Sequence, residues 1–416
     1  MKNQVSPALL ARDALVARVL MLAATAATVV MTTRTLGVSG QGDWALLQFG
    51  LLLVTGFSGY VAGGAVVYVR KFFAARHMVP LAVTGIAVSM GLGMGVGQIT
   101  GWVPSHWRWE AMWLGGLQAA VVLMSQLVLA AGMVRFFHAT QALQVVMMAV
   151  IWALFVAAGD ATLDDFVVAL RGSLMVTLAL LLWGHRNVWS ENAQGEESQR
   201  ARNRRGAPRS LTSLMLVKGA EGQTGSLLQL WTNRLNISQL ERFVSLDASG
   251  LYALGYYALE AVWIVGRAWS PAVHAQSAAE NDDGRRKAHT VWHVKRVVAL
   301  SGLSAVVMAC VPDSLWSLVF RVQGLQTVLQ SLTVAMVAGS VATLISHHLS
   351  GVGLHRWNAV TSGLGFLVLW GCSTLWIPGT HSAVDGATMA GWALSASSAV
   401  QCAGLLLVFI QTTKSS

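Results

Sequence analysis

Five ionisable side chains fall inside long apolar stretches of the sequence: Arg18, Lys218, Glu221, Glu260 and Arg267. A charge inside hydrocarbon costs several kcal/mol unless it faces water or an opposite charge. On a helix, Lys218 shares a face with Glu221 at i, i+3, and Glu260 shares one with Arg267 at i, i+7. Cations in this setting can hold a phosphate through charge-assisted hydrogen bonds, whereas the acids can serve in coupling or in ion pairs.

The polar face is longest around Lys218. Glu221 and Gln223 continue it toward the middle of the same apolar run, which favours a water-filled cavity and predicts that Lys218 and Glu221 face a space between two halves of the molecule. For Arg18 and Arg267 a second interpretation stays open, because each lies about two turns from a predicted membrane interface and a long side chain can reach the surface from there.

The composition predicts that the helices carrying these residues cross a membrane. Of the residues, 55% are hydrophobic and 11% charged, and the mean hydropathy is +0.57. Apolar runs of about 20 residues recur along the chain, the length at which a helix spans a bilayer, without the alternating pattern of barrel strands. Twelve spans are predicted, over residues 14–33, 44–69, 79–102, 111–134, 139–158, 163–183, 211–232, 248–270, 297–320, 325–346, 352–376 and 386–411.

A pattern repeats at half the chain length. The eight residues from Gly42 read GDWALLQF, and the eight from Gly250, 208 positions later, read GLYALGYY. Internal repeats are typical of secondary transporters. The sequence therefore predicts an all-α polytopic membrane protein with two six-helix lobes related by a rotation of about 180° about the membrane normal. The predicted parts are an N-terminal lobe 1–183, a cytoplasmic linker 184–210 and a C-terminal lobe 211–416.

Lysine and arginine favour one side of the predicted spans by about four to one, which places both termini in the cytoplasm of a bacterial cell, with the chain in the inner membrane. The net charge of +10 then reflects topology, and no nucleic-acid partner is expected. A second long polar loop is predicted over residues 277–295, within the second half.

Motifs for enzymatic chemistry are missing from the sequence. It has no Walker sequence, no CxxC pair and no H-E-x-x-H, so we predict no cofactor, no metal and no catalytic residue. An integral membrane enzyme of glycan assembly is the least favoured class, because the predicted external loops are short and the cytoplasmic segments are too small for a catalytic domain.

Several segments resemble bacterial polysaccharide flippases of the O-antigen type, within the multidrug/oligosaccharidyl-lipid/polysaccharide exporter superfamily. Thr35-Leu36-Gly37 through Gly42-Asp43-Trp44-Ala45-Leu46, followed by a glycine-rich helix ending Val69-Arg70-Lys71, is similar to the opening of that family. In the second half, Arg234-Leu235-Asn236, the repeat at Gly250 and Ala268-Trp269-Ser270-Pro271-Ala272-Val273 resemble its seventh and eighth helices and their exit.

The resemblance implies a transporter that flips undecaprenyl-diphosphate-linked oligosaccharide from the cytoplasmic to the outer leaflet by alternating access, during O-antigen, capsule or exopolysaccharide assembly. The matching positions for a cationic substrate-binding cavity are Arg18, Lys218 and Arg267. Implied partners are the polyprenyl-diphosphate-linked glycan, membrane lipid and other polysaccharide assembly proteins, and the chain is expected to act as a monomer.

Two other transporter classes stay open. A cation-coupled multidrug or small-molecule exporter of the same superfamily would use Glu221 and Glu260 as its working groups, although the three embedded cations outnumber them. A major-facilitator transporter also has six plus six helices. Its basic loop signature should lie between the second and third spans, where this chain reads Arg70-Lys71-Phe72-Phe73-Ala74-Ala75-Arg76.

Overall fold

The computed structural model describes residues 7–70, 72–190, 210–280 and 282–412, and within them every regular element is a helix. Ten helical segments of this part of the chain are long and apolar enough to cross a membrane. The prediction of an all-α polytopic membrane protein is therefore confirmed.

The twelve predicted spans and the ten apolar segments differ for two reasons. The segment Val16–Val69 contains the first two predicted spans, because α1 (Pro7–Ala62) continues through a break at Gly37 and is followed by α2 (Gly64–Val69). The seventh predicted span is absent from the ten, although α8 (Leu211–Phe243) is a continuous helix of 33 residues. At 1.5 Å per residue it is about 50 Å long, more than a bilayer requires. Its polar residues lower its mean hydropathy.

The predicted loop over residues 277–295 is wrong. α9 (Leu246–Ala279) extends into it from one side, and α10 (Asp283–Cys310) begins inside it from the other. Hydropathy marks only the part of a helix that lies in hydrocarbon, whereas arginine, lysine and alanine favour helix beyond that depth. The predicted ninth span, 297–320, also joins two elements, since a separate short helix, α11 (Asp313–Phe320), follows Pro312.

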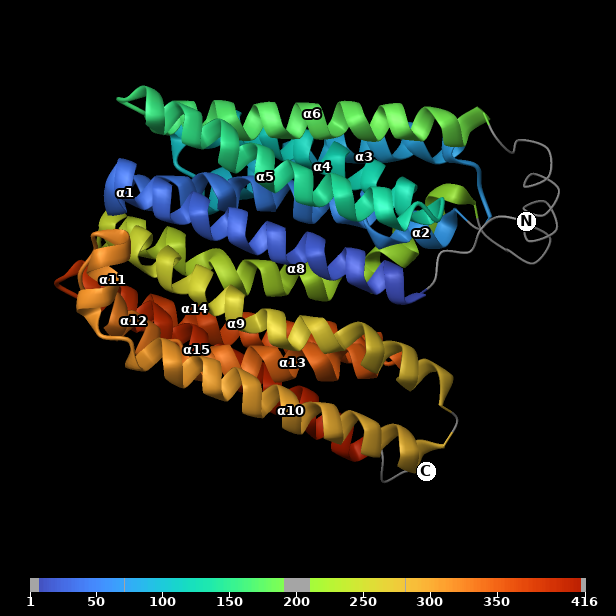
Figure 1. The fold of residues 1–416 in the computed structure, drawn as a ribbon. Helices are drawn as coiled ribbons and strands as arrows, with labels where there is room; N and C mark the ends of the chain where they lie inside the picture. The colour runs from blue at the N-terminus through green and yellow to red at the C-terminus, as the bar shows by residue number, and fades with distance from the viewer. Residues whose placement is uncertain (1–6, 71, 191–209, 281, 413–416) are drawn as a thin grey trace. The chain divides into compact units, whose positions relative to one another are not determined.

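By contacts, the chain forms two compact units: Met1–Leu36 with Leu47–Gln223, and Gly37–Leu46 with Thr224–Ser416. The predicted linker 184–210 falls largely outside the described residues. In the first unit α4 packs against its neighbours α2, α3, α5 and α6. α3, α5 and α6 are long helices that run beside α4 (Figure 1). These helices are α3 (Ala75–Thr100), the 3-10 turn Ser105–Trp107, α4 (Arg108–Ala130), α5 (Val134–Ala158) and α6 (Leu163–Ser190).

The second unit is arranged around α13, which packs against α9, α10, α14 and α15. Its core is a cluster of buried hydrophobic side chains that includes Ile345, Leu405 and Phe409. The remaining elements of this unit are α12 (Leu325–Ser331), α13 (Thr333–Gly351), α14 (His355–Trp376) and α15 (Ala383–Thr412).

The repeat offset of 208 holds through the first three helices of each half. The break inside α1 is at Gly37, which has φ 73°, and the corresponding break between α8 and α9 has Ser245 as its N-cap. α3 begins at Ala75 and α10 begins at Asp283, again 208 positions apart. Later helices are displaced further along the chain, because α11, which begins 208 positions after the 3-10 turn at Ser105, is longer than that turn.

The two repeat glycines pack against each other's helices in the second unit. A Cβ atom on Gly42 would overlap the carbonyl oxygen of Leu246, and one on Gly250 would overlap that of Val38. Leu246 is four residues before Gly250, and Val38 is four residues before Gly42, so the contact is reciprocal. Such self-complementarity is what a twofold relation between two equivalent segments produces.

We expect Gly250→Ala and Gly42→Ala to destabilise the protein by about 1–3 kcal/mol, because the added methyl group meets backbone that cannot rotate away. The matched control is Gly91→Ala in α3, where a Cβ has nothing within 4 Å and alanine favours helix. Thermal unfolding in detergent checks this. Equal melting temperatures for all three variants would contradict the close crossing.

Candidate functional site

In the first unit the structure pairs two of the predicted residues. The Lys218 Nζ donates a hydrogen bond to the Glu221 Oε2 at 2.6 Å, and the side chains are 33% and 48% exposed. The same ammonium group lies 5.3 Å from the centre of the Tyr68 ring. Gln223 instead donates to the backbone carbonyl of Gly56 at 3.4 Å, so this part of the polar face of α8 contacts α1.

Arg18 and Arg267 differ from Lys218 in having no carboxylate partner among the described residues. Arg18 is exposed on α1 in the first unit, near enough to His138 for their charges to interact. Arg267 is exposed on α9 in the second unit, with its guanidinium 6.0 Å from the centre of the Trp263 ring. Arg267 therefore does not pair with Glu260, although both lie on one face of α9.

The partner of Glu260 is Arg234, on α8. The Arg234 Nη2 donates to the Glu260 Oε2 at 3.4 Å, and the Tyr256 hydroxyl donates to the Oε1 of the same carboxylate at 3.4 Å. The guanidinium lies 4.3 Å from the centre of the Tyr256 ring and 5.8 Å from that of Tyr257. Tyr257 is also in polar contact with Trp44. These five residues, Trp44, Arg234, Tyr256, Tyr257 and Glu260, form the arginine site.

The arginine site is buried on one side and open on the other. The Arg234 side chain is 6% exposed, whereas that of Glu260 is 31% exposed. The Nη1 of Arg234 is buried and has no hydrogen-bond partner in the described part of the chain. A buried guanidinium with an unused donor can bind one further acceptor, such as a phosphate or carbonyl oxygen.

A neutral polar cluster lies two residues further along α8. The Asn236 amide nitrogen donates to the Tyr252 hydroxyl at 3.2 Å and to the Ala390 carbonyl at 2.7 Å, and Ser373 donates to the amide oxygen at 2.5 Å. This asparagine joins α8, α9, α14 and α15 with its donors and acceptor in use. Its role is structural.

The predicted end of the seventh span at residue 232 is wrong, because it leaves Arg234 in a loop before the eighth span. α8 continues to Phe243, and all residues from Arg234 to Leu240 are buried. Hydropathy fails here because the segment holds arginine, asparagine, serine and glutamine among its apolar residues. The signal that pointed to it was the resemblance of Arg234-Leu235-Asn236 to a family motif.

The charges of the arginine site are not required by the fold of the repeat. At the offset of 208, Arg234 corresponds to Ala26 and Glu260 corresponds to Leu52. The first half thus builds the same two helices with an apolar pair at these positions. Because buried ion pairs add little net stability, the charges in the second half require another explanation.

Among the described cations of the predicted spans and the arginine site, apart from Arg356 in the first turn of α14, each unit contains one without a carboxylate, Arg18 in the first and Arg267 in the second. The paired cations are Lys218 with Glu221 and Arg171 with Glu110, at 2.8 Å, in the first unit, and Arg234 with Glu260 in the second. Within the described residues no group of His, Cys, Asp and Glu side chains has the arrangement of a metal site.

Comparisons with solved structures identify the fold. An inward-facing multidrug resistance MATE family transporter of the MOP superfamily matches with a TM-score of 0.71 and 10% identity over 95% of each chain. The lipid II flippase MurJ matches with a TM-score of 0.62 and 11% identity, over 96% of this chain and 87% of that one. The Vibrio cholerae MATE transporter VcmN matches with a TM-score of 0.56 and 14% identity over 98% of each chain. No family model and no curated protein matches the sequence.

The chain therefore has the fold that MATE transporters and MurJ share. This fold agrees with the one that the resemblance implies, and the assignment to O-antigen flippases stays a prediction.

We expect Glu260→Leu to lower stability by on the order of 2 kcal/mol, because it leaves Arg234 buried without its counter-ion. This value is below that for a fully buried pair, since Glu260 is about one third exposed. The double substitution Arg234→Ala with Glu260→Leu, which restores the residues of the first repeat, should recover most of the loss. Thermal unfolding of wild type, both single variants and the double variant measures the coupling. Additive losses would show that the two side chains do not act as a pair.

Proposed function

We propose that the protein is a membrane transporter that flips undecaprenyl-diphosphate-linked oligosaccharide from the cytoplasmic to the outer leaflet by alternating access, for surface polysaccharide assembly. The observation that carries this proposal is the excess of embedded cations over carboxylates, one in each unit. In this proposal both termini lie in the cytoplasm of a bacterial cell.

An excess of positive charge within the membrane-spanning segments suits an anionic cargo. A diphosphate cannot enter hydrocarbon without compensation, and arginine and lysine supply charge-assisted hydrogen bonds that replace its hydration. The polyprenyl tail of such a substrate can stay in lipid while the charged part crosses. The shared fold with a lipid II flippase supports a lipid-linked glycan as cargo, and it favours the MOP superfamily over the major-facilitator class.

In this mechanism Arg18, Lys218 and Arg267 attract the diphosphate, and the two carboxylates act as internal counter-ions. Glu221 forms an ion pair with Lys218 while the site is empty, and Glu260 forms one with Arg234. Substrate phosphate then competes with a carboxylate for each cation. The competition keeps binding weak enough for release on the opposite side of the membrane.

A cation-coupled multidrug exporter is the second candidate, and the MATE match with a TM-score of 0.71 favours it. In that case Glu221 and Glu260 would be the essential groups. Both carboxylates are already paired with a cation, which leaves little negative charge for a cationic cargo. The two candidates therefore make opposite predictions for the acidic residues.

We expect Arg18→Gln, Lys218→Gln and Arg267→Gln each to lower substrate affinity about ten- to hundredfold, the equivalent of about 1.5–3 kcal/mol for one charged hydrogen bond. Arg18→Lys and Arg267→Lys should retain more function, because the charge survives although the bidentate geometry is lost. Complementation of a deletion strain at matched membrane levels, with surface polysaccharide as readout, measures this.

Arg356→Gln is the matched control for these substitutions, since Arg356 is an exposed cation at the start of α14. It should complement fully. Normal polysaccharide from the triple variant of Arg18, Lys218 and Arg267 would exclude the cationic site.

Glu221→Gln separates the two candidate functions. For a diphosphate carrier we expect the variant to bind substrate more tightly than wild type, because the competitor for Lys218 is gone. Complementation should then persist at a reduced level, because tighter binding slows release. For a cation-coupled exporter the same variant should lose transport of cationic dyes. Substrate binding no tighter than that of wild type, at an unchanged protein level, would count against the proposed role of Glu221 as counter-ion.

A further inference from the structure

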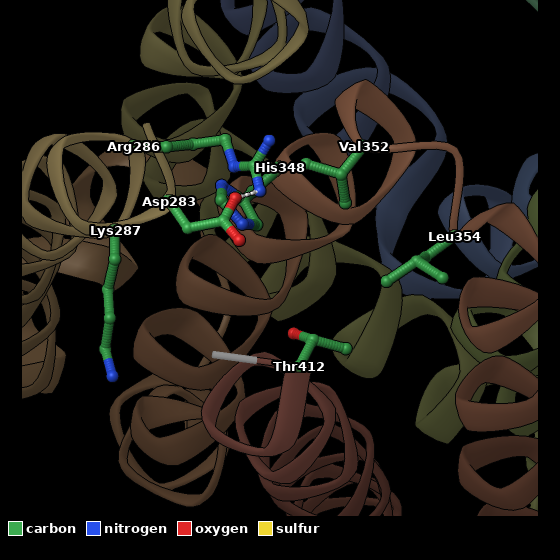
Figure 2. A pocket seen from close by; sticks show the side chains of 7 residues that line it. All are labelled: Asp283, Arg286, Lys287, His348, Val352, Leu354 and Thr412. Atoms are coloured by element: carbon green, nitrogen blue, oxygen red, sulfur yellow. Dashed lines mark hydrogen bonds and ion pairs between the residues drawn. The ribbon is translucent and has the colours of Figure 1, made fainter. Parts of the chain in front are cut away.

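A cavity lies where four helices of the second unit end. Its volume is about 190 Å³, several times that of a water molecule. It is lined by Asp283, Arg286 and Lys287 of α10, His348 of α13, Val352 and Leu354 of the turn before α14, and Thr412 of α15. Figure 2 shows Arg286, Asp283 and His348 gathered on one side, with Thr412 across from them.

His348 forms a buried, fixed part of the cavity wall. The residue is 3% exposed, and its ring packs edge-on against Phe409 with centroids 4.9 Å apart. The hydroxyls of Ser277 and Thr290 both lie 2.8 Å from Nδ1. Thr290 donates to the Arg286 carbonyl at 3.1 Å, so its oxygen is an acceptor toward Nδ1, and we assign the N–H of the imidazole to Nδ1. The histidine thus fixes the wall of the cavity, and its Nε2 is not a donor to a ligand.

Arg286 supplies hydrogen-bond donors beside this histidine. One of its terminal nitrogens forms an ion pair with Asp283, and the other donates to the Glu280 carbonyl at 3.4 Å. A guanidinium has five N–H groups in a planar fork, so several are left for a ligand. Lys287, on the same turn of α10, adds positive charge at the cavity. Cationic donors thus outnumber the single carboxylate, a balance that suits a phosphate.

The position of the cavity along α10 indicates where the phosphate comes from. This helix has 28 residues and is about 42 Å long, about 12 Å more than the hydrocarbon core. If its apolar C-terminal part fills the core, the turns holding Asp283 and Arg286 extend into the headgroup layer. Trp292 is 47% exposed and carries the guanidinium of Arg296 at 3.4 Å from its ring centre, the kind of residue that marks a membrane interface. Val352 and Leu354 give the cavity an apolar wall.

We propose that this cavity binds the phosphate of a phospholipid headgroup, with the Arg286 guanidinium as its donor. The site is separate from the proposed transport site and does not depend on the identity of the cargo. Basic pockets between the ends of membrane helices are where protein side chains meet lipid phosphate at an interface.

The test uses the purified full chain in detergent, with lipid binding followed by native mass spectrometry and thermal unfolding. The probes are phosphatidylglycerol, diacylglycerol, which lacks the phosphate, and inorganic phosphate. The test variant is the double substitution Arg286→Gln with Lys287→Gln. Its control, Arg285→Gln with Lys295→Gln, removes equal charge from the same helix at exposed positions outside the cavity.

We expect the test variant to bind phosphatidylglycerol at least about tenfold more weakly than wild type, and the control variant to bind it within about twofold of wild type. Melting temperatures without lipid establish that both variants are folded. The proposal is overturned if both variants lose the same affinity, if diacylglycerol binds as well as phosphatidylglycerol, or if inorganic phosphate alone stabilises the protein. The last result would identify a soluble anion as the ligand.

Discussion

The crossing of α1 and α9 at Gly42 and Gly250 is the contact on which the arginine site depends. Without Cβ atoms at these two positions the backbones meet directly, and the segments that follow each glycine are brought together. Trp44 is two residues after Gly42, and Tyr257 is seven residues after Gly250, so the polar contact between their side chains follows from the crossing. Tyr256 and Tyr257, on α9, then lie against the Arg234 guanidinium.

A duplicated fold separates what the architecture requires from what has been added to it. The offset of 208 relates the break at Gly37 to the break at Ser245, and the start of α3 to the start of α10. The first helices of both halves therefore have the same bounds relative to one another. One half has Ala26 at the position where the other has Arg234. The guanidinium, whose Nη1 has no partner among the described residues, is therefore an addition to the duplicated packing and no requirement of it.

The sequence predicted the helical class and most spans because hydrophobic length depends only on the bilayer. It also predicted the repeat, because both halves have a glycine at the position where a Cβ atom would overlap the backbone of the other helix. It did not predict the partner of Glu260. Arg267 shares its helix face, but the partner comes from another helix, and pairing between helices depends on packing that periodicity does not contain. Arg234 was missed because hydropathy averages a window, and a fully buried helix turn with polar residues in it looks like a loop.

In the proposed mechanism, the placement of the carboxylates lets the transporter release what it binds. A site with unopposed cations would hold a diphosphate tightly on both sides of the membrane, whereas cations that already have partners bind it only by exchange. Lys218 has Glu221 on the same helix, three residues away, and Arg234 has Glu260 on the next helix. A carboxylate that a phosphate displaces loses its counter-ion, and this loss is moderate because both glutamates are partly exposed. In this mechanism the displaced carboxylates favour release, and Arg18 and Arg267, which have no carboxylate partner among the described residues, supply the remaining attraction.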